Sequence, residues 1–336
     1  MNNSDILLYD VTLRDGSHAV KHQLTSEQIS KYSQLAEKAG VDVLEVGHGI
    51  GLGASSLLIG KSLLSDEEML ITAKSNLNNT LLGIHVVPGF ATASRDISKA
   101  IDCGVDVVRI ATQCTEADTS EQHISYVRKK GRRTYGALMM AHMLSPEMLL
   151  QEALKMESYG AEGITILDSA GAFLPDDVSK RIDLLVNNLK IPVGFHAHNN
   201  LGMSIANSLA AVKSGAQIID GSLSGFGAGA GNASLELLEA VFQMQGYQTN
   251  LDLYTLLDIG DQAKDILKVL PEITSSSIVS GMNGVVSVYS KPVARAAELY
   301  NVDSRDIYIE LGRRKAIAGQ EDLIVEVAQM LAGKNK

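Results

Sequence analysis

One repeated pattern constrains the fold of this chain more than any other feature. A segment with helical periodicity ends on a glycine, a short turn follows, and a run rich in valine and isoleucine begins. The pattern occurs in EKAGVDVLEVG (37–47), IDCGVDVVRIAT (101–112), MESYGAEGITILD (156–168) and VKSGAQIIDGSL (212–223). Glycine suits the end of a helix, where the chain needs a left-handed residue. A β-branched apolar run indicates a strand buried on both faces, which is typical of parallel sheets.

The sequence contains eight strand-like runs of this kind, with helical patterns between them. They are ILLYDVTL, DVLEVG, TLLGIHVV, DVVRIAT, TYGALMMA, GITILD, PVGFHAH and QIIDGSL. Eight strand–helix units within residues 1–248 have the size of a (β/α)8 barrel, an α/β fold. A doubly wound open sheet is the alternative. It needs fewer strands and usually a glycine-rich phosphate turn after the first strand, which is missing here.

The alternation of strands and helices ends after about residue 248. The segments LDLYTLLDIGDQAKDILKVL and VARAAELYNVDSRDIYIELG have helical patterns, and no further strand–helix alternation follows. We therefore expect two domains: a catalytic barrel over residues 1–248 and a small, mainly helical domain over residues 249–336.

Composition excludes several classes of function. Of the 336 residues, 45% are hydrophobic and 20% charged, the formal net charge is −10, and there is no tryptophan. This balance argues against binding to nucleic acid or to an anionic membrane surface. No run approaches the roughly 18 apolar residues that a membrane span requires, and MNNSDILLYD lacks the basic region of a signal peptide. With only two cysteines, we expect a cytoplasmic protein.

Charged and polar side chains lie at the ends of two of the predicted strands. Arg14, Asp15 and His18 come after the first strand, and the seventh ends in His196-Ala-His198. Strand ends carry the chemistry in such barrels, and residues two apart in a strand point to the same side. A lone Asp or His at a strand end is usually structural. One carboxylate and two imidazoles together favour a facial metal site with open positions.

Other motifs carry weaker signals. The glycine-rich GFGAGAGN (225–232) follows the eighth strand. It is not a P-loop, because no Lys-Ser/Thr follows it, and a tight loop closing the barrel near the metal is the favoured interpretation. His22, His48 and His123 carry no specific signal, and His142 is expected to form a hydrogen bond at the barrel mouth.

Several segments together resemble the 4-hydroxy-2-oxovalerate aldolases, which are pyruvate-specific class II aldolases of the DRE-type metallolyase group, related to HMG-CoA lyase. The likeness covers nearly the whole chain. The segments are TLRDGSHAVKHQ, EVGHG, ATQCTEAD, HAHNNLGMSIANS, GFGAGAGNASLE and GRRKAIAGQEDLIVEVA. The first and the last are specific to the aldolase branch, whereas the two histidines and the glycine-rich loop are shared more widely.

The resemblance implies that Asp15, His196 and His198 hold a divalent metal, which chelates the carboxylate and keto oxygens of a 2-oxo acid. Arg14, Ser169 and His196 are then the substrate-binding residues. Oxygen and imidazole ligands suit Mn, Mg, Co or Zn. Binding two substrate oxygens as well requires more than four positions, which favours Mn²⁺, with Mg²⁺ or Co²⁺ as alternatives, over Zn²⁺.

The resemblance also implies a separate role in catalysis or substrate binding for each of several residues. Arg14 would stabilise the pyruvate enolate formed in retro-aldol cleavage. His18 would be the general base that takes the proton of the C4 hydroxyl. Ser169, in LDSAG, would hold the substrate carboxylate. Glu45 could orient Arg14 or pair with another cation.

Three departures from the family pattern concern the aldehyde end of the substrate. Val286 replaces a family tyrosine, and Tyr289 could substitute for it only if the loop were remodelled. The third strand ends His85-Val-Val87, where the family is apolar, and His85 either joins the acceptor pocket or faces water at the rim. Asn199 stands where the family commonly has histidine. We therefore expect an aldehyde larger or more polar than acetaldehyde.

The resemblance further implies a partner, because these aldolases usually work bound to an acylating aldehyde dehydrogenase. The C-terminal helical domain is the expected docking surface. One rival function is a Claisen-type lyase or synthase that uses an acyl-CoA. Another is a noncatalytic subunit that binds a 2-oxo acid and regulates a dehydrogenase. The intact Arg14, Asp15 and His18 argue against the second rival.

Overall fold

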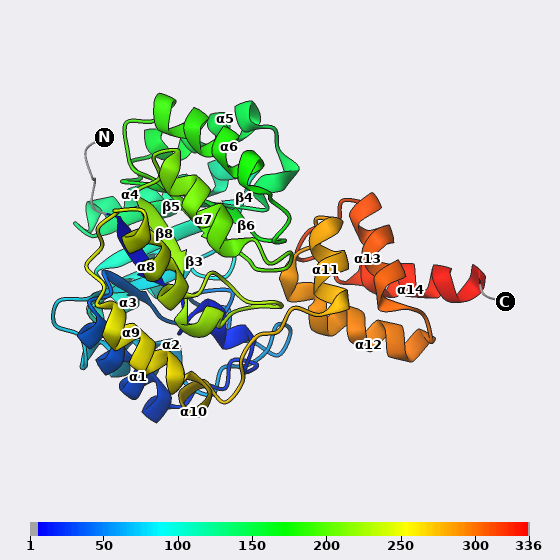
Figure 1. The fold of residues 1–336 in the computed structure, drawn as a ribbon, viewed down its shortest axis with the longest axis horizontal. Coiled ribbons are helices and arrows are strands. Elements are labelled where there is room, and N and C mark those ends of the chain that lie inside the picture. The colour runs from blue at the N-terminus through cyan, green and yellow to red at the C-terminus, as the bar shows by residue number, and fades with distance from the viewer. Residues whose placement is uncertain (1–5, 335–336) are drawn as a thin grey trace.

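A computed structural model describes residues 6–334 of the chain, so the outermost ends of the two predicted domains, including the start of MNNSDILLYD, lie outside the described residues. Eight parallel strands close into a barrel in chain order, with β8 beside β1 (Figure 1). This confirms the predicted (β/α)8 fold. The strands are β1 (Leu7–Asp10), β2 (Val43–Glu45), β3 (Leu81–Val86), β4 (Val107–Gln113), β5 (Arg133–Met139), β6 (Ile164–Asp168), β7 (Val193–Ala197) and β8 (Ile218–Gly221).

Eight helices cover the outside of the barrel. They are α1 (Ser26–Ala39), α2 (Asp66–Lys74), α3 (Ser98–Asp102), α4 (Glu121–Lys129), α5 (Pro146–Ser158), α6 (Pro175–Asn188), α7 (Ser204–Lys213) and α8 (Leu235–Met244). The first begins at the expected capping box, in which Thr25 and Gln28 exchange side-chain and backbone hydrogen bonds, and it ends at Gly40 with φ of 80°. Within residues 6–334, no helix is long and apolar enough to cross a lipid bilayer.

Short helical turns occupy several of the loops that follow the strands. They are η1 (Asp15–His18), η2 (Ala93–Ile97), η3 (Ala117–Ser120), η4 (Ala141–Met143), η5 (Leu223–Gly225) and η6 (Ser287–Tyr289). Four of them (η1, η3, η4 and η5) lie directly after barrel strands, so the loops at the carboxyl end of the barrel are locally ordered. η1 carries two of the predicted site residues at its two ends.

Two apolar layers fill the barrel interior. Near the start of the strands, Tyr9 packs with residues that include Tyr135 and Ile218. Near the end of the strands, Ala111, Ala137 and Leu167 form a second cluster. The outward faces of the strands pack against the helices in the main hydrophobic core. The polar residues of the interior therefore lie between the two layers and at the mouth.

Six helices follow the barrel. They are α9 (Leu253–Asp261), α10 (Ala263–Leu267), α11 (Ser275–Met282), α12 (Ser290–Tyr300), α13 (Ser304–Arg313) and α14 (Asp322–Lys334). α9 and α10 pack on the barrel helices α1 and α8, whereas α11 to α14 form a separate body beside the barrel (Figure 1). The division at residue 248 remains a prediction; in the structure the helices that leave the barrel begin at α11.

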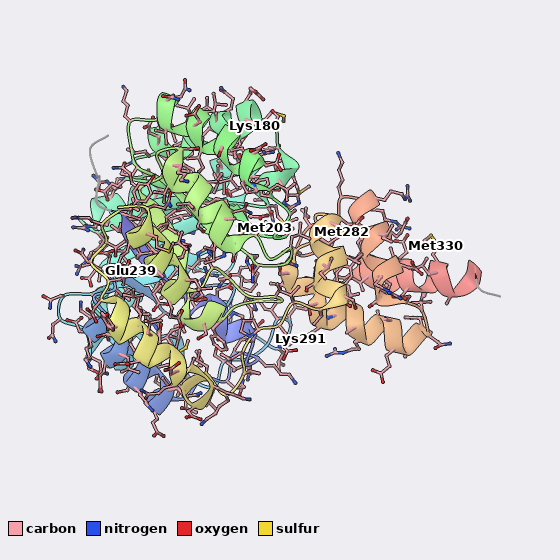
Figure 2. All side chains as sticks on the ribbon, viewed as in Figure 1. Lys180, Met203, Glu239, Met282, Lys291 and Met330 are labelled. Carbon is pink, nitrogen blue, oxygen red and sulfur yellow. The ribbon has the colours of Figure 1, made fainter. Side chains whose placement is uncertain are left out.

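The C-terminal body contacts the barrel at the carboxyl ends of the strands. Lys291, at the junction of the two bodies in Figure 2, donates to the carbonyl oxygen of His18 over 2.9 Å. The backbone nitrogen of Ser287 donates to the carbonyl of Ser169 over 3.2 Å, and its hydroxyl donates to Asn200 Oδ1 over 2.9 Å. The C-terminal body therefore covers part of the barrel mouth and touches loops that carry predicted site residues.

Candidate metal centre and substrate site

Three predicted metal ligands converge at the barrel mouth. Asp15, His196 and His198 are all buried, and each offers a ligand atom within 4.8 Å of the others. Asp15 begins η1 directly after β1, and the two histidines point the same way because they are two residues apart at the end of β7. Nδ1 of His198 is buried without a hydrogen-bond partner. One carboxylate and two imidazoles without a thiolate fit a divalent cation such as Mn²⁺ or Mg²⁺.

The glycine-rich loop after β8 holds the Asp15 carboxylate in place. Oδ2 accepts hydrogen bonds from the backbone nitrogen of Ala228 (3.1 Å) and from Asn232 Nδ2 (3.0 Å). A Cβ at Gly227 would lie 2.8 Å from the same oxygen, so this position has no room for a side chain. Burial alone would raise the pKa of Asp15, but the Arg14 guanidinium and the nearby imidazoles hold that pKa well below its usual range.

Arg14 is fixed by three acceptors and keeps one nitrogen uncommitted. Nε donates to Glu45 Oε2 over 2.7 Å, and Nη1 donates to Asp15 Oδ1 over 3.0 Å and to the carbonyl of Gly49 over 3.3 Å. Nη2 is buried without a partner. Glu45 therefore contacts Arg14, and its other oxygen lies 3.4 Å from Nε of a second cation, Arg109, so both alternatives for Glu45 are present. The guanidinium presents an unpaired donor in a buried site.

His18 lies in a group of three histidines that the sequence did not indicate. Its ring packs on Gly49, where a Cβ would come within 2.4 Å of His18 Cδ2. The ring of His22 stands edge-on to it at 5.0 Å and stacks on His48 at 3.6 Å. Burial lowers the pKa of His18 to about 4, against the opposing charge of Asp15. His18 is therefore neutral at physiological pH, and the low pKa makes it a weaker base than a histidine of ordinary pKa.

Ser169 lies at the mouth, directly after β6. Its Oγ accepts a hydrogen bond from the backbone nitrogen of Met140 over 3.0 Å, so the hydroxyl hydrogen is left to donate elsewhere. Met140 has φ of 56°, in the left-handed region that non-glycine residues rarely adopt. Strain of this kind is common at functional sites. The placement suits the expected contact with a substrate carboxylate.

A buried charge network beneath the metal ligands was missed from the sequence. The Nδ1 hydrogen of His196 is donated to Asp220 Oδ2 over 2.9 Å, and Arg109 binds both oxygens of Asp220. The available signal was a charged residue inside each of two apolar strands, DVVRIAT and QIIDGSL. A hydrogen-bonded carboxylate behind a ligating histidine is the usual support of a metal site.

Comparisons with known proteins identify the family. Residues 5–262 match the HMGL-like family, and residues 271–333 match the DmpG-like communication domain. The chain is 58% identical to a 4-hydroxy-2-oxovalerate aldolase of Pectobacterium atrosepticum, over 98% of this chain and 97% of that protein. A protein of the same name from Spirochaeta aurantia is 54% identical over 99% of each chain. This chain belongs to the HMGL-like family and, within it, to the 4-hydroxy-2-oxovalerate aldolases.

Solved structures of lower identity support the fold alone. The N-terminal domain of a putative aldolase from Bacteroides vulgatus superposes with a TM-score of 0.72 at 23% identity, covering 84% of this chain and 94% of that one. The carboxyl transferase domain of Rhizobium etli pyruvate carboxylase, solved with pyruvate, gives a TM-score of 0.81 at 15% identity, covering 99% of this chain and 62% of that one. The family match and the curated relatives confirm the resemblance found in the sequence, and the family's metal dependence agrees with the three-ligand cluster.

The departures from the family at the third strand lie inside the barrel. His85 is 3% exposed, so the alternative in which it faces water at the rim is wrong. Its Nδ1 has no hydrogen-bond partner and lies 3.9 Å from Glu45 Oε2. Burial lowers the pKa of His85 to about 3, so the ring is neutral. Val87, two residues on, packs against the cluster of Ala111 and Leu167.

The other departures lie in the C-terminal body and in the loop after β7, and they differ from one another. Val286 is buried. The Tyr289 hydroxyl donates to the carbonyl of Ile317 and accepts from the backbone nitrogen of Gln320 over 3.3 Å. These contacts lie within the C-terminal body, so the Tyr289 hydroxyl does not replace that of the missing tyrosine in this structure. Asn199 accepts from the Ser204 hydroxyl at the start of α7 over 2.9 Å.

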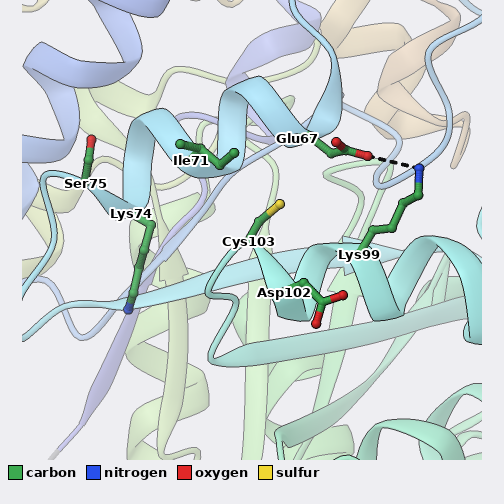
Figure 3. Close-up of a pocket in the computed structure, with 7 residues that line it drawn as sticks. All are labelled: Glu67, Ile71, Lys74, Ser75, Lys99, Asp102 and Cys103. Carbon is green, nitrogen blue, oxygen red and sulfur yellow. Dashed lines mark hydrogen bonds and ion pairs between the residues drawn. The ribbon is translucent and has the colours of Figure 1, made fainter.

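A surface hollow lies elsewhere, between α2 and α3 (Figure 3). Its lining includes Glu67 and Lys99, which form an ion pair at 3.1 Å, and Cys103. None of the predicted site residues lines it. It lies among the outer helices rather than at the strand ends, where the chemistry of such barrels takes place.

The metal ligands predict how the protein binds a divalent cation. After stripping with a chelator, the native chain should bind one equivalent of Mn²⁺ in calorimetry. Asp15→Asn and His198→Ala should each weaken binding by about 100-fold or more, beyond the loss typical of an outer-shell change. His123→Ala is the matched control, because His123 contacts the carbonyl of Ala91 on the outer side of the barrel. Native affinity in either ligand variant would contradict the assignment.

Proposed function

We propose that this chain is a divalent-metal-dependent aldolase that reversibly cleaves a 4-hydroxy-2-oxo acid to pyruvate and an aldehyde. The observation that carries the proposal is the buried Asp15–His196–His198 cluster together with Arg14, which contacts Asp15 through Nη1 and keeps Nη2 without a partner. The family membership and the names of its close relatives support the same reaction.

The first residue roles concern the 2-oxo acid. A divalent cation held by Asp15, His196 and His198 would polarise the keto group as a Lewis acid. The Ser169 hydroxyl donates to the substrate carboxylate and fixes its orientation. As the C3–C4 bond breaks, its electron pair moves toward the keto oxygen and an enolate forms. Arg14 donates from Nη2 to that oxygen and, held by Glu45, needs no reorganisation.

The second role concerns the aldehyde half. The C4 hydroxyl must lose its proton as the C4 carbonyl forms, and neutral His18 accepts it. Gly49 leaves room for the His18 ring and thereby sets its position beside Arg14. The enolate then gains a proton at C3, which balances the proton lost by the C4 hydroxyl, and pyruvate results. Retro-aldol cleavage by these groups needs no oxidant and no further substrate.

The proposed cation is Mn²⁺, with Mg²⁺ or Co²⁺ as alternatives. Three protein ligands plus two oxygens of a chelating 2-oxo acid exceed four coordination positions. Mn²⁺ and Mg²⁺ accept octahedral geometry with oxygen-rich ligands more readily than Zn²⁺ does.

Pyruvate release from racemic 4-hydroxy-2-oxopentanoate tests the proposed reaction. The chelator-stripped chain should be inactive, and Mn²⁺ should restore turnover. Arg14→Lys should lower kcat by about 10²- to 10³-fold, as expected for a lost oxyanion donor. The matched control is Arg295→Lys on α12. Turnover that is unaffected by stripping, or that requires an acyl-CoA, would contradict the proposal.

We further infer that the acceptor aldehyde is larger or more polar than acetaldehyde. His85 on β3 and Val87 directly after it point to the same inward side, because they are two residues apart. His85 brings an unpartnered buried nitrogen to this face, and Val87 an apolar wall. Val286 adds space where the family has a tyrosine. A buried polar atom without a partner is costly unless a ligand satisfies it.

Aldol addition of pyruvate to different aldehydes measures this preference. We expect kcat/KM to be higher with glycolaldehyde than with acetaldehyde or propanal. His85→Leu should lower the value for glycolaldehyde by about tenfold, the worth of one hydrogen bond, and change that for propanal much less. A clear preference of the native chain for acetaldehyde would end this inference.

The C-terminal body is proposed to dock an acylating aldehyde dehydrogenase in the cytoplasm. Its match to a communication domain supports this. It also exposes large apolar side chains, among them Met282 and Leu299, which are 70% and 73% exposed. Large apolar side chains exposed in this way are available to a docking partner.

Co-expression with such a dehydrogenase and size-exclusion chromatography tests the docking. The two proteins should co-elute from the cytoplasmic fraction. Leu299→Glu should abolish co-elution without changing pyruvate release, because a buried charge opposes association. Tyr254→Glu, at an 81% exposed position on α9, is the matched control. Equal co-elution of both variants would contradict docking through this surface.

A further inference from the structure

Arg109 is a cation enclosed in the barrel core. It lies on β4 and is 1% exposed. By volume it is the largest fully buried side chain among the described residues. Its guanidinium carbon lies 4.1 Å from the centre of the Tyr9 ring, in the apolar layer near the start of the strands. Burying a charge is costly unless it is paired. The partners of the guanidinium must therefore offset the free-energy cost of burying its charge.

On one side, Arg109 holds the residue that orients a metal ligand. Nη1 and Nη2 bind the two oxygens of Asp220, the latter over 3.1 Å. Asp220 in turn accepts the Nδ1 hydrogen of His196 over 2.9 Å. This bond fixes the tautomer of His196 and leaves its Nε2 as the lone-pair donor toward a cation. The two-pronged contact requires the planar fork of arginine.

On the other side, Arg109 faces the residue that orients Arg14. Its Nε lies 3.4 Å from Glu45 Oε1, while Glu45 Oε2 accepts from Arg14 Nε over 2.7 Å. The Glu45 carboxylate therefore bridges the two arginines. Another titratable neighbour, His85, is neutral and lies 3.9 Å from the same carboxylate. Arg14 itself contacts the metal ligand Asp15.

The charges of this network are matched to a cation. Two guanidinium groups face the three carboxylates of Asp15, Glu45 and Asp220, which leaves one net negative charge at the candidate metal centre. Burial would raise the pKa of Asp220, but Arg109 lowers it below its usual range, so the carboxylate stays charged behind His196. Arg109 contacts both Asp220, which holds His196, and Glu45, which holds Arg14.

We propose that Arg109 is a positioning residue that holds the enolate-stabilising Arg14, through Glu45, and the metal ligand His196, through Asp220, in a single charged network. This inference rests on the proposed function for the role of Arg14. The network has two arms: the metal arm runs from Arg109 through Asp220 to His196, and the enolate arm runs from Arg109 through Glu45 to Arg14. The metal arm is independent of any reaction.

Arg109→Lys tests both arms, because it keeps the charge and loses the fork. In calorimetry, the Mn²⁺ dissociation constant of the stripped chain should rise about 10- to 100-fold. At saturating Mn²⁺, exchange of the pyruvate C3 hydrogens for deuterium, followed by NMR, should slow by about tenfold or more. Arg181→Lys is the matched control. Arg181 is a partly buried arginine that lies over the Phe173 ring at 4.6 Å and binds the carbonyl of Leu144.

Two further variants separate the arms and decide the matter if Arg109→Lys does not fold. Asp220→Asn should weaken Mn²⁺ binding by the same 10- to 100-fold or so, and it should slow exchange at saturating metal less than Glu45→Gln does. Glu45→Gln should slow exchange more strongly than it weakens Mn²⁺ binding. A merely structural role would lower thermal stability without this split.

The proposal is overturned if a folded Arg109→Lys, or Asp220→Asn in its place, binds Mn²⁺ within twofold of the native chain. It is also overturned if Asp220→Asn slows exchange at saturating Mn²⁺ as much as Glu45→Gln does. A different result would show that the proposed function is wrong. In that case the native chain would bind Mn²⁺ but would not exchange the C3 hydrogens of pyruvate.

Discussion

The buried carboxylate of Asp15 is the interaction on which the site depends. It stays charged in the barrel mouth because Arg14 and Asn232 donate to it from opposite sides. Arg14 and Asp15 follow the first strand, and the loop that contacts Asp15 follows the eighth strand. Since the eighth strand pairs with the first, barrel closure itself assembles the donor set. The same carboxylate thus requires the closed fold and defines the place where a cation can bind.

The barrel and the ligand cluster could be predicted from the sequence because both follow from local rules. Glycine-ended helices before β-branched runs give strand–helix units, and parallel strands place all their carboxyl ends together. The spacing of His196 and His198 then settles which way they point. In each case the evidence lies within a few consecutive residues, so no long-range contact had to be known.

The charge network and the histidine group could not be predicted, because they depend on register between distant strands. Arg109 meets Asp220 across the barrel, and Glu45 joins them from β2. His22 reaches His48 through two loops that are irregular in sequence. The position of Tyr289 was equally hidden, since its hydroxyl is held by backbone atoms of the loop before α14. Burial also decides the case of His85, whose sequence context allowed either a pocket or a solvent-facing position.

A crystal structure of the chain with Mn²⁺ and oxalate, a planar mimic of the pyruvate enolate, tests the central claim most directly. The account predicts Mn²⁺ bound by Asp15, His196 and His198 and chelated by oxalate. One oxalate oxygen should accept from Arg14 Nη2, and the far carboxylate should contact the Ser169 hydroxyl. Mn²⁺ bound to other residues, or oxalate oriented away from Arg14, would contradict the account.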